Sequence, residues 1–141
     1  MMEKEFVDAN ILVYAHDRGA GKKHDRALAV MRRLWENGQG ALSTQVLQEF
    51  CVSLRCRSAR PVTASEIKEL IEDYTSWEIV TNNPPSILQA LEIQDRYEIS
   101  FWDALILQAA ENCGASVLYS EDLSAGQKYG SVKVVNPLTD D

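Results

Sequence analysis

The fold is decided by the stretch Phe6-Val7-Asp8-Ala9-Asn10-Ile11-Leu12-Val13-Tyr14-Ala15. Phe6 and Val7 form a short apolar strand that ends at Asp8, and Ile11 to Tyr14 are expected to be the first turns of a helix. A strand that leads directly into a helix is the repeating unit of an α/β protein. We therefore expect the same alternation in the rest of the chain.

Alternating strands and helices do continue to the end of the chain. Apolar residues repeat at helical spacing from Ala27 to Trp35, and Thr63-Ala64-Ser65-Glu66 is a capping box that starts a later helix. The other expected helices contain Val46–Leu54, Ile87–Tyr97 and Phe101–Asn112, and the expected strands are Phe6–Val7, Ala41–Ser43, Glu78–Thr81, Val117–Tyr119 and Val132–Val135. This order predicts an α/β fold, with a mainly parallel central sheet of about 4–5 short strands and helices on both faces.

The size and composition of the chain fit one domain spanning residues 1–141. Its 141 residues are 45% hydrophobic and 25% charged, an ordinary globular mixture that argues against disordered and collagen-like classes. The longest apolar run, Ala9 to Ala15, is interrupted by Asn10 and is far shorter than the ~20 residues that a membrane span needs. We therefore expect no membrane insertion.

Charge and cysteine content limit the possible partners and location. The chain has 21 acidic and 14 basic residues, and its net charge of −7 argues against a protein that coats nucleic acid by general attraction. An enzyme whose acids gather in a metal site stays possible, because bound cations reverse the local charge.

Cys51, Cys56 and Cys113 show no CxxC spacing, and Met1–Glu5 has no signal-peptide pattern. We therefore expect reduced thiols and a cytoplasmic location.

Four acidic residues stand at or near the ends of expected strands. Asp8 follows the first strand, and Glu49 lies five residues after Thr44, which follows the second strand. Asp122 comes shortly after the strand Val117–Tyr119, and Asp103 lies near the start of the preceding helix. Ligands of parallel sheets bind beyond the carboxyl ends of the strands, so order and spacing alone bring four carboxylates to one edge.

Each of these acids also has a purely structural interpretation. Asp8 or Asn10 could cap the first helix, Glu49 could be a solvated residue, and Asp122 could belong to a turn. Asp103 is harder to explain, because its helix face is apolar and a buried carboxylate must be paired or bound to metal.

The structural interpretation of Asp103 is a variant of the capping box. In it Ser100 is the N-cap and Asp103 occupies the third helical position, near the positive end of the helix. This capping role and a metal-binding role are compatible.

The residue types at this edge suit Mg²⁺ or Mn²⁺. His16 and His24 are expected at the surface, and no set of His and Cys has zinc spacing. The segment Gly19-Ala20-Gly21-Lys22-Lys23 has glycines without the spacing of a phosphate-binding loop. What remains is a cluster of hard oxygen ligands, which is typical of phosphoryl transfer with a metal-activated water.

Four segments together resemble PIN-domain proteins and, within them, the VapC-like toxins of bacterial toxin–antitoxin modules. These segments are Phe6–Ala15, Leu42–Phe50, Ile99–Ile106 and Leu118–Leu123. The closing Val134-Val135-Asn136-Pro137 is similar as well, so the resemblance covers nearly the whole chain. It implies an endoribonuclease that depends on Mg²⁺ or Mn²⁺, is usually a homodimer and is held inactive by a cognate antitoxin.

The resemblance also assigns roles to residues. The family's three usual acids fall on Asp8, Glu49 and Asp103, and its less constant fourth acid falls on Asp122. Asp8 and Asp103 are then the expected direct metal ligands, while Glu49 and Asp122 bind metal through water or orient the attacking hydroxide. Small polar residues that would hold the carboxylates and waters in place are Asn10, Thr44 and Ser120.

An RNA substrate also requires positive charge near the site. Arg55, Arg57 and Arg60 follow the helix of Glu49 and could contact RNA phosphates or an acidic stretch of the antitoxin, or could form only a solvated face. Apolar residues of the early helices could line a partner groove, although core packing is expected for most of them: Leu12, Tyr14, Leu34 and Trp35.

Other classes of protein fit the sequence less well. A haloacid-dehalogenase-like phosphatase needs a second acid where Asn10 stands, and a phospho-receiver domain needs an acceptor Asp where the chain has Thr81-Asn82-Asn83. The serious alternative is a catalytically inactive PIN-like module that binds protein or RNA. Intact acids count against it, and metal binding without RNA cleavage would favour it.

Overall fold

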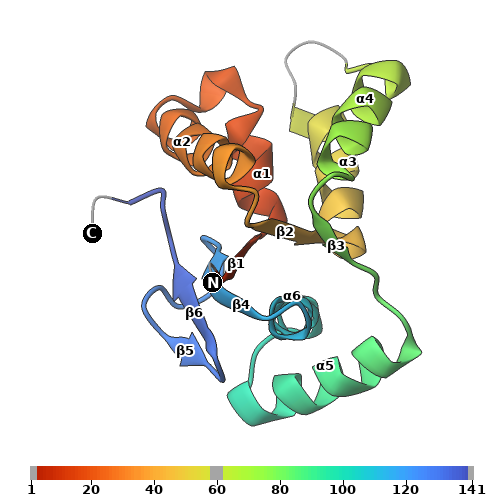
Figure 1. Ribbon diagram of the computed structural model, residues 1–141, viewed down its shortest axis with the longest axis vertical. Helices are drawn as coiled ribbons and strands as arrows, with labels where there is room; N and C mark the ends of the chain where they lie inside the picture. The colour runs from red at the N-terminus through yellow and green to blue at the C-terminus, as the bar shows by residue number, and fades with distance from the viewer. Residues whose placement is uncertain (1–2, 58–61, 140–141) are drawn as a thin grey trace.

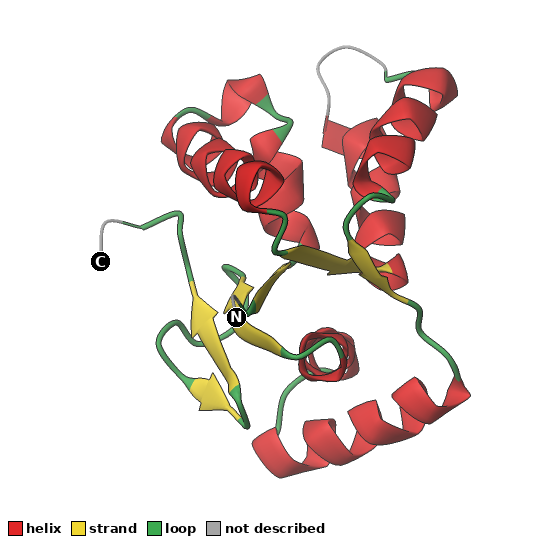
Figure 2. Ribbon diagram, in the orientation of Figure 1, coloured by secondary structure: helices red, strands yellow, loops and turns green. Residues whose placement is uncertain are grey.

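The computed structural model describes residues 3–57 and 62–139, without the side chain of Arg57, and alternates strands with helices (Figures 1 and 2). The strands are β1 (Lys4–Val7), β2 (Gly40–Ser43), β3 (Glu78–Val80), β4 (Ala115–Tyr119), β5 (Lys128–Tyr129) and β6 (Val132–Val135). The helices are α1 (Ala9–Ala15), a 3-10 turn η1 (Arg18–Ala20), α2 (Lys22–Asn37), α3 (Thr44–Arg57), α4 (Ala64–Tyr74), α5 (Pro84–Tyr97) and α6 (Phe101–Asn112).

The strands form one sheet in the order β3-β2-β1-β4-β6-β5. All neighbouring strands are parallel except β5 and β6, which form a short antiparallel pair. Helices α1 to α4 lie on one side of the sheet and α5 and α6 on the other (Figure 1). The expected α/β fold is confirmed, and β5 is an additional strand whose two residues are too few to show a sequence pattern.

Local capping explains where several helices begin. Thr63 accepts a hydrogen bond from the Glu66 amide at 3.1 Å, as the capping box predicted, and α4 follows it. Asn83 does the same for α5 by accepting from the amide of Ser86 at 3.0 Å, with Pro84 as the first helical residue. The helix α2 begins at Lys22, before its first apolar residue, and its first turn carries the exposed polar side chains of Lys22, Lys23 and Asp25.

The core lies between the sheet and the two helical layers. Phe6 and Val7 of β1 are fully buried, and α6 is buried along the whole of Ala104–Ala110. Leu12 and Leu34 have no exposed surface, so they pack in the core and do not line a groove. No helix in the described ranges has both the length and the apolar character required to cross a membrane.

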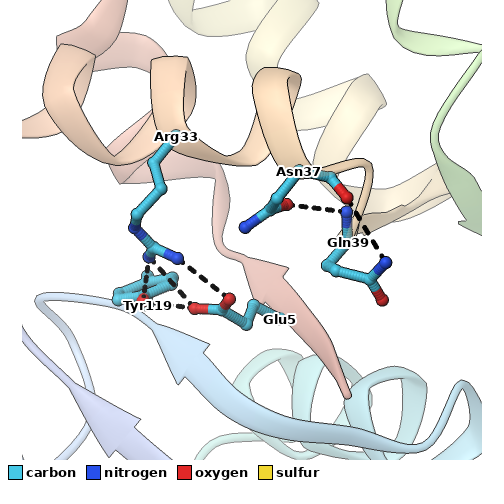
Figure 3. Close-up of polar contacts among 5 residues, drawn as sticks. All are labelled: Glu5, Arg33, Asn37, Gln39 and Tyr119. Atoms are coloured by element: carbon cyan, nitrogen blue, oxygen red, sulfur yellow. Dashed lines mark hydrogen bonds and ion pairs between the residues drawn. The ribbon is translucent and has the colours of Figure 1, made fainter. Parts of the chain in front are cut away.

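A polar network fastens α2 to the two central strands (Figure 3). The Arg33 guanidinium donates to both carboxylate oxygens of Glu5, each at 3.0 Å, and also to the Tyr119 hydroxyl, which itself donates to Glu5. These contacts lower the pKa of Glu5, chiefly through the hydrogen bond from Arg33. Because Glu5 lies on β1 and Tyr119 on β4, the network holds together the strands whose carboxyl ends carry Asp8 and Ser120.

Candidate active site

The candidate site lies where the direction of strand addition reverses. From β1 the chain adds β2 and β3 on one side, and later β4 and β6 on the other. Ligands of open α/β sheets bind beyond the carboxyl ends of the strands at such a switch point. Val7 pairs with Tyr119, so the next residues, Asp8 and Ser120, meet at this edge.

Asp8 is a buried carboxylate with only 4% of its surface exposed. One oxygen accepts from the Ala9 amide at 2.7 Å, so Asp8 caps α1 as expected, and the other accepts from the Ser120 hydroxyl at 2.8 Å. Burial raises the pKa of Asp8 to about 7; the two hydrogen bonds oppose this shift, and the negative charges of Glu49 and Asp122 add to it. Asp8 therefore combines the capping role with a strongly perturbed carboxyl group.

Ser120 connects Asp8 with the loop that carries Asp122. It is fully buried, donates to Asp8 and accepts from the Asp122 amide at 3.1 Å. Asp122 itself is exposed in a bend, as its turn interpretation expected. The position of Ser120 supports its expected role of holding a carboxylate.

Asp103 occupies the first turn of α6 and is partly buried. Ser100 accepts from the Asp103 amide at 3.1 Å, so the predicted N-cap is confirmed. Burial raises the pKa of Asp103, the hydrogen bond with Ser100 lowers it, and the charge of Asp122 raises it again. Asp122 thus acts electrostatically on both Asp8 and Asp103.

Glu49 is exposed on α3, one turn after Gln45. The Gln45 side-chain nitrogen donates to the Glu49 carboxylate at 2.8 Å and to the Trp102 carbonyl at 3.3 Å. Sequence reasoning missed Gln45, although its spacing of four residues from Glu49 is the helical spacing at which side chains meet.

Asn10 and Thr44 differ in how they relate to the acids. Both polar atoms of the Asn10 side chain are buried without a hydrogen-bond partner in the described part of the chain. The Thr44 hydroxyl donates to the side-chain oxygen of Asn82 at 3.0 Å and accepts from the backbone N–H of Asn82 at 3.2 Å. Thr44 is therefore bonded to the end of β3, and its expected support of the carboxylates stays a prediction.

The same edge offers oxygen ligands but no compact metal cluster. Among residues 3–57 and 62–139, no three His, Cys, Asp or Glu side chains form a group that could hold a metal ion. The expected close cluster of four carboxylates therefore stays a prediction. The residues nevertheless fit a hydrated divalent cation, which needs only one or two carboxylates and keeps several waters. The partnerless amide atoms of Asn10 fit hydrogen bonds to such waters.

One basic residue, Lys23, is paired with the loop of Asp122 at this edge. Lys23 of α2 forms an ion pair with Glu121, the neighbour of Asp122, at 3.3 Å. Arg55 is exposed on α3, whereas the side chain of Arg57 and the whole of Arg60 lie outside the described residues. The expected contacts of these arginines with RNA or an antitoxin stay predictions.

Fold and site together define an α/β protein with acidic residues at the switch point of a parallel sheet. A family model described as the PIN domain matches residues 6–128, and the chain belongs to this family. The resemblance inferred from the sequence is thereby confirmed. Members of the family are nucleases, which is the class of activity that the resemblance implied.

Solved structures with a similar fold include three proteins of toxin–antitoxin systems. VapC20 of Mycobacterium tuberculosis, described as a toxin that cleaves the sarcin-ricin loop, is 22% identical with a TM-score of 0.65, covering 84% of this chain and 90% of that one. A toxin–antitoxin complex from Klebsiella pneumoniae is 16% identical with a TM-score of 0.66, covering 95% and 98%. DNA-bound VapBC from Salmonella typhimurium is 15% identical with a TM-score of 0.63, covering 94% and 97%. No curated protein sequence matches the chain.

Proposed function

We propose that the protein is a metal-dependent endoribonuclease that hydrolyses RNA phosphodiesters as the toxin of a toxin–antitoxin pair. The observation that carries this proposal is Asp8, a buried carboxylate with a pKa of about 7 on which the charges of Glu49 and Asp122 act. A buried group of this kind at a ligand-binding edge is typical of a functional site. A fold shared with toxins, one of them described as cleaving the sarcin-ricin loop, supports the choice of RNA as substrate.

The proposed chemistry divides the acids into two groups. Asp8 and Asp103 would hold Mg²⁺ or Mn²⁺ directly, while Glu49 and Asp122 would bind it through water and orient the attacking water. When bound, such a cation polarises the phosphodiester and lowers the pKa of the attacking water. Ser120 fixes the orientation of Asp8, and Asn10 offers both a donor and an acceptor to waters of the site.

The proposed partners are an antitoxin and a second copy of this chain. A cleft of about 1020 Å³ separates α1 and α2 from α3 and α4, and its walls carry both apolar and charged side chains. The lining includes Leu28, Arg32, Leu54, Glu69 and Leu70. Such a mixed surface suits an amphipathic antitoxin segment.

The free cysteines in the described part of the chain agree with the proposed reducing cytoplasm.

The test is cleavage of total cellular RNA by the purified chain, freed of any bound partner. Reactions contain Mg²⁺, Mn²⁺ or EDTA, and the variants Asp8→Asn and Asp103→Asn run beside the wild-type protein. We expect discrete fragments that require the metal and fall by at least about 100-fold with either variant, because each removes a metal ligand.

A matched control is Asp95→Asn, which removes an exposed carboxylate from α5. It should cleave RNA as the wild-type protein does. Unchanged turnover in a clean Asp8→Asn preparation would refute the assigned role of Asp8. Metal binding without cleavage of any RNA would favour the inactive interaction module.

A further inference from the structure

Gln45 is a buried amide at the candidate site, with 6% of its surface exposed. It lies in the first turn of α3, where its backbone amide donates to the Asn82 side chain at 3.3 Å. Its side-chain nitrogen donates to Glu49 at 2.8 Å and to the Trp102 carbonyl at 3.3 Å. One side chain thus bridges α3 to the residue that precedes Asp103.

The chemistry of these two partners fixes the orientation of the amide. A carboxylate and a carbonyl oxygen can only accept hydrogen bonds, so the NH₂ group of Gln45 must face both of them. The side-chain oxygen then points elsewhere, and it is buried without a partner in the described part of the chain. A buried acceptor that finds no donor destabilises the folded state. This oxygen therefore indicates a donor supplied from outside the protein chain.

The bridge also sets the geometry between two acids of the site. Glu49 is exposed on its helix, and an exposed side chain of this length samples many rotamers. The hydrogen bond from Gln45 restricts the Glu49 carboxylate. Because the same nitrogen also donates to Trp102, it links this carboxylate to the first turn of α6, which contains Asp103. The two donor bonds account for the NH₂ group of Gln45, whereas its buried oxygen is left to accept a bond from a group outside the chain.

We propose that Gln45 is a positioning residue: it holds the Glu49 carboxylate relative to Asp103, and its oxygen accepts a hydrogen bond from a water molecule of the hydrated cation. This inference rests on the proposed metal-dependent function. It adds a further neutral residue to a site that already includes Ser120 and Asn10 beside the acids. Groups that orient metal ligands in this way typically contribute about 10–100-fold to metal affinity or activity.

Gln108 of α6 provides a matched control for the loss of a buried glutamine. It is 3% exposed, its nitrogen donates to Gln89 at 2.8 Å, and its oxygen also has no partner in the described residues. It lines a separate cavity of about 260 Å³ beside β3 and α5, which has room for water. The variants Gln45→Met and Gln108→Met therefore remove similar groups, one at the acids and one away from them.

The experiment measures three properties of the wild-type 141-residue chain and both variants. These are Mn²⁺ affinity by calorimetry, kcat and KM for RNA cleavage, and the thermal unfolding midpoint. We expect similar unfolding midpoints for the two variants. Only Gln45→Met should weaken Mn²⁺ binding and lower kcat, each by about 10–100-fold, with KM for RNA unchanged.

A second variant, Gln45→Asn, keeps the amide but is one methylene too short to reach both partners. It should show the same metal defect, and it provides the test if Gln45→Met does not fold. Equal Mn²⁺ affinity and kcat in the Gln45 and Gln108 variants would overturn the positioning role and leave the ribonuclease proposal intact. Wild-type protein that binds Mn²⁺ but cleaves no RNA would overturn the ribonuclease, while the Mn²⁺ comparison would still decide the role of Gln45.

Discussion

The carboxylate of the single residue Asp8 is needed for the proposed metal binding, but its burial lowers the stability of the metal-free protein at neutral pH. Its pKa rises from 3.8 to about 7 in the folded chain, so the native state binds a proton more tightly than the unfolded state does. Between about pH 4 and about pH 7 the free energy of unfolding therefore falls as pH rises. The metal-free protein is least stabilised by Asp8 at neutral pH, where a cation would need its carboxylate.

Replacing this carboxylate should consequently stabilise the protein while removing activity. Asp8→Asn keeps an acceptor for the Ala9 amide and a group that can bond Ser120, but it carries no charge. We expect the free energy of unfolding at pH 7 without metal to rise by about 1–3 kcal/mol. Urea unfolding with EDTA measures this change. A clear loss of stability would show that the pKa of Asp8 is not raised in the folded chain.

Metal binding should depend on pH for the same reason. Protons compete with the cation for Asp8, so Mn²⁺ affinity should fall about tenfold per pH unit below about pH 7 and level off above it. Calorimetry across this range tests the prediction. In Asp8→Asn, any remaining binding should lose most of this slope, and the slope that is left should come from Asp103, whose pKa is also raised. An unchanged slope in the variant would assign the titration to another group.

The sequence predicted more about Asp8 than about its neighbours. A carboxylate directly after a strand can cap a helix and face the sheet edge, and both predictions for Asp8 agree with its contacts. Thr44 was grouped with the acids because it follows a strand, but pairing of β2 with β3 brings it to Asn82 instead. Gln45 was missed because its partner Trp102 is 57 residues away along the chain, a contact that only the tertiary fold creates.

At the scale of helices, the start of α6 places Asp103 at the site. Ser100 caps α6 and Thr63 caps α4 with hydrogen bonds of the same length, 3.1 Å. Ser100→Ala and Thr63→Ala should each lower the free energy of unfolding by about 1 kcal/mol. Only Ser100→Ala should also reduce RNA cleavage, because it frays the turn that carries Asp103.

Thermal unfolding and cleavage assays on both variants test this difference. Thr63→Ala serves as the control for stability loss, since α4 contributes no acid to the site. Equal activity of the two variants would mean that the cap of α6 does not position Asp103.

Helices and strands with clear periodicity were predictable, and their ends were less so. The capping box at Thr63 and the strand pattern Val132–Val135 each matched an observed element. The two-residue strand β5 was not predictable, because Lys128 and Tyr129 are a strand only through pairing with β6. Similarly, the start of α2 at Lys22 depends on a polar turn that carries no apolar signal.

At the scale of the whole molecule, the site joins four distant parts of the chain. Asp8 follows β1, Glu49 lies on α3, Asp103 on α6 and Asp122 after β4. The alternation of elements predicted that these parts share an edge. It did not give the order β3-β2-β1-β4-β6-β5, because strand order depends on packing between elements far apart in sequence. The Arg33 network is one such contact, since it links α2, β1 and β4.

A cation bound between these parts should stabilise the entire fold. Binding to the native state alone adds about 2.7 kcal/mol at a concentration 100-fold above Kd. For a chain of this size that corresponds to a rise of roughly 10 °C in the unfolding midpoint. Calorimetric scans with Mn²⁺ should show this rise, EDTA should reverse it, and a monovalent salt of equal ionic strength should not reproduce it. The double variant Asp8→Asn, Asp103→Asn should unfold at the same temperature with and without Mn²⁺. If the double variant keeps the full rise, the cation binds outside the edge formed by β1 and β4, and the assignment of Asp8 and Asp103 as metal ligands is wrong.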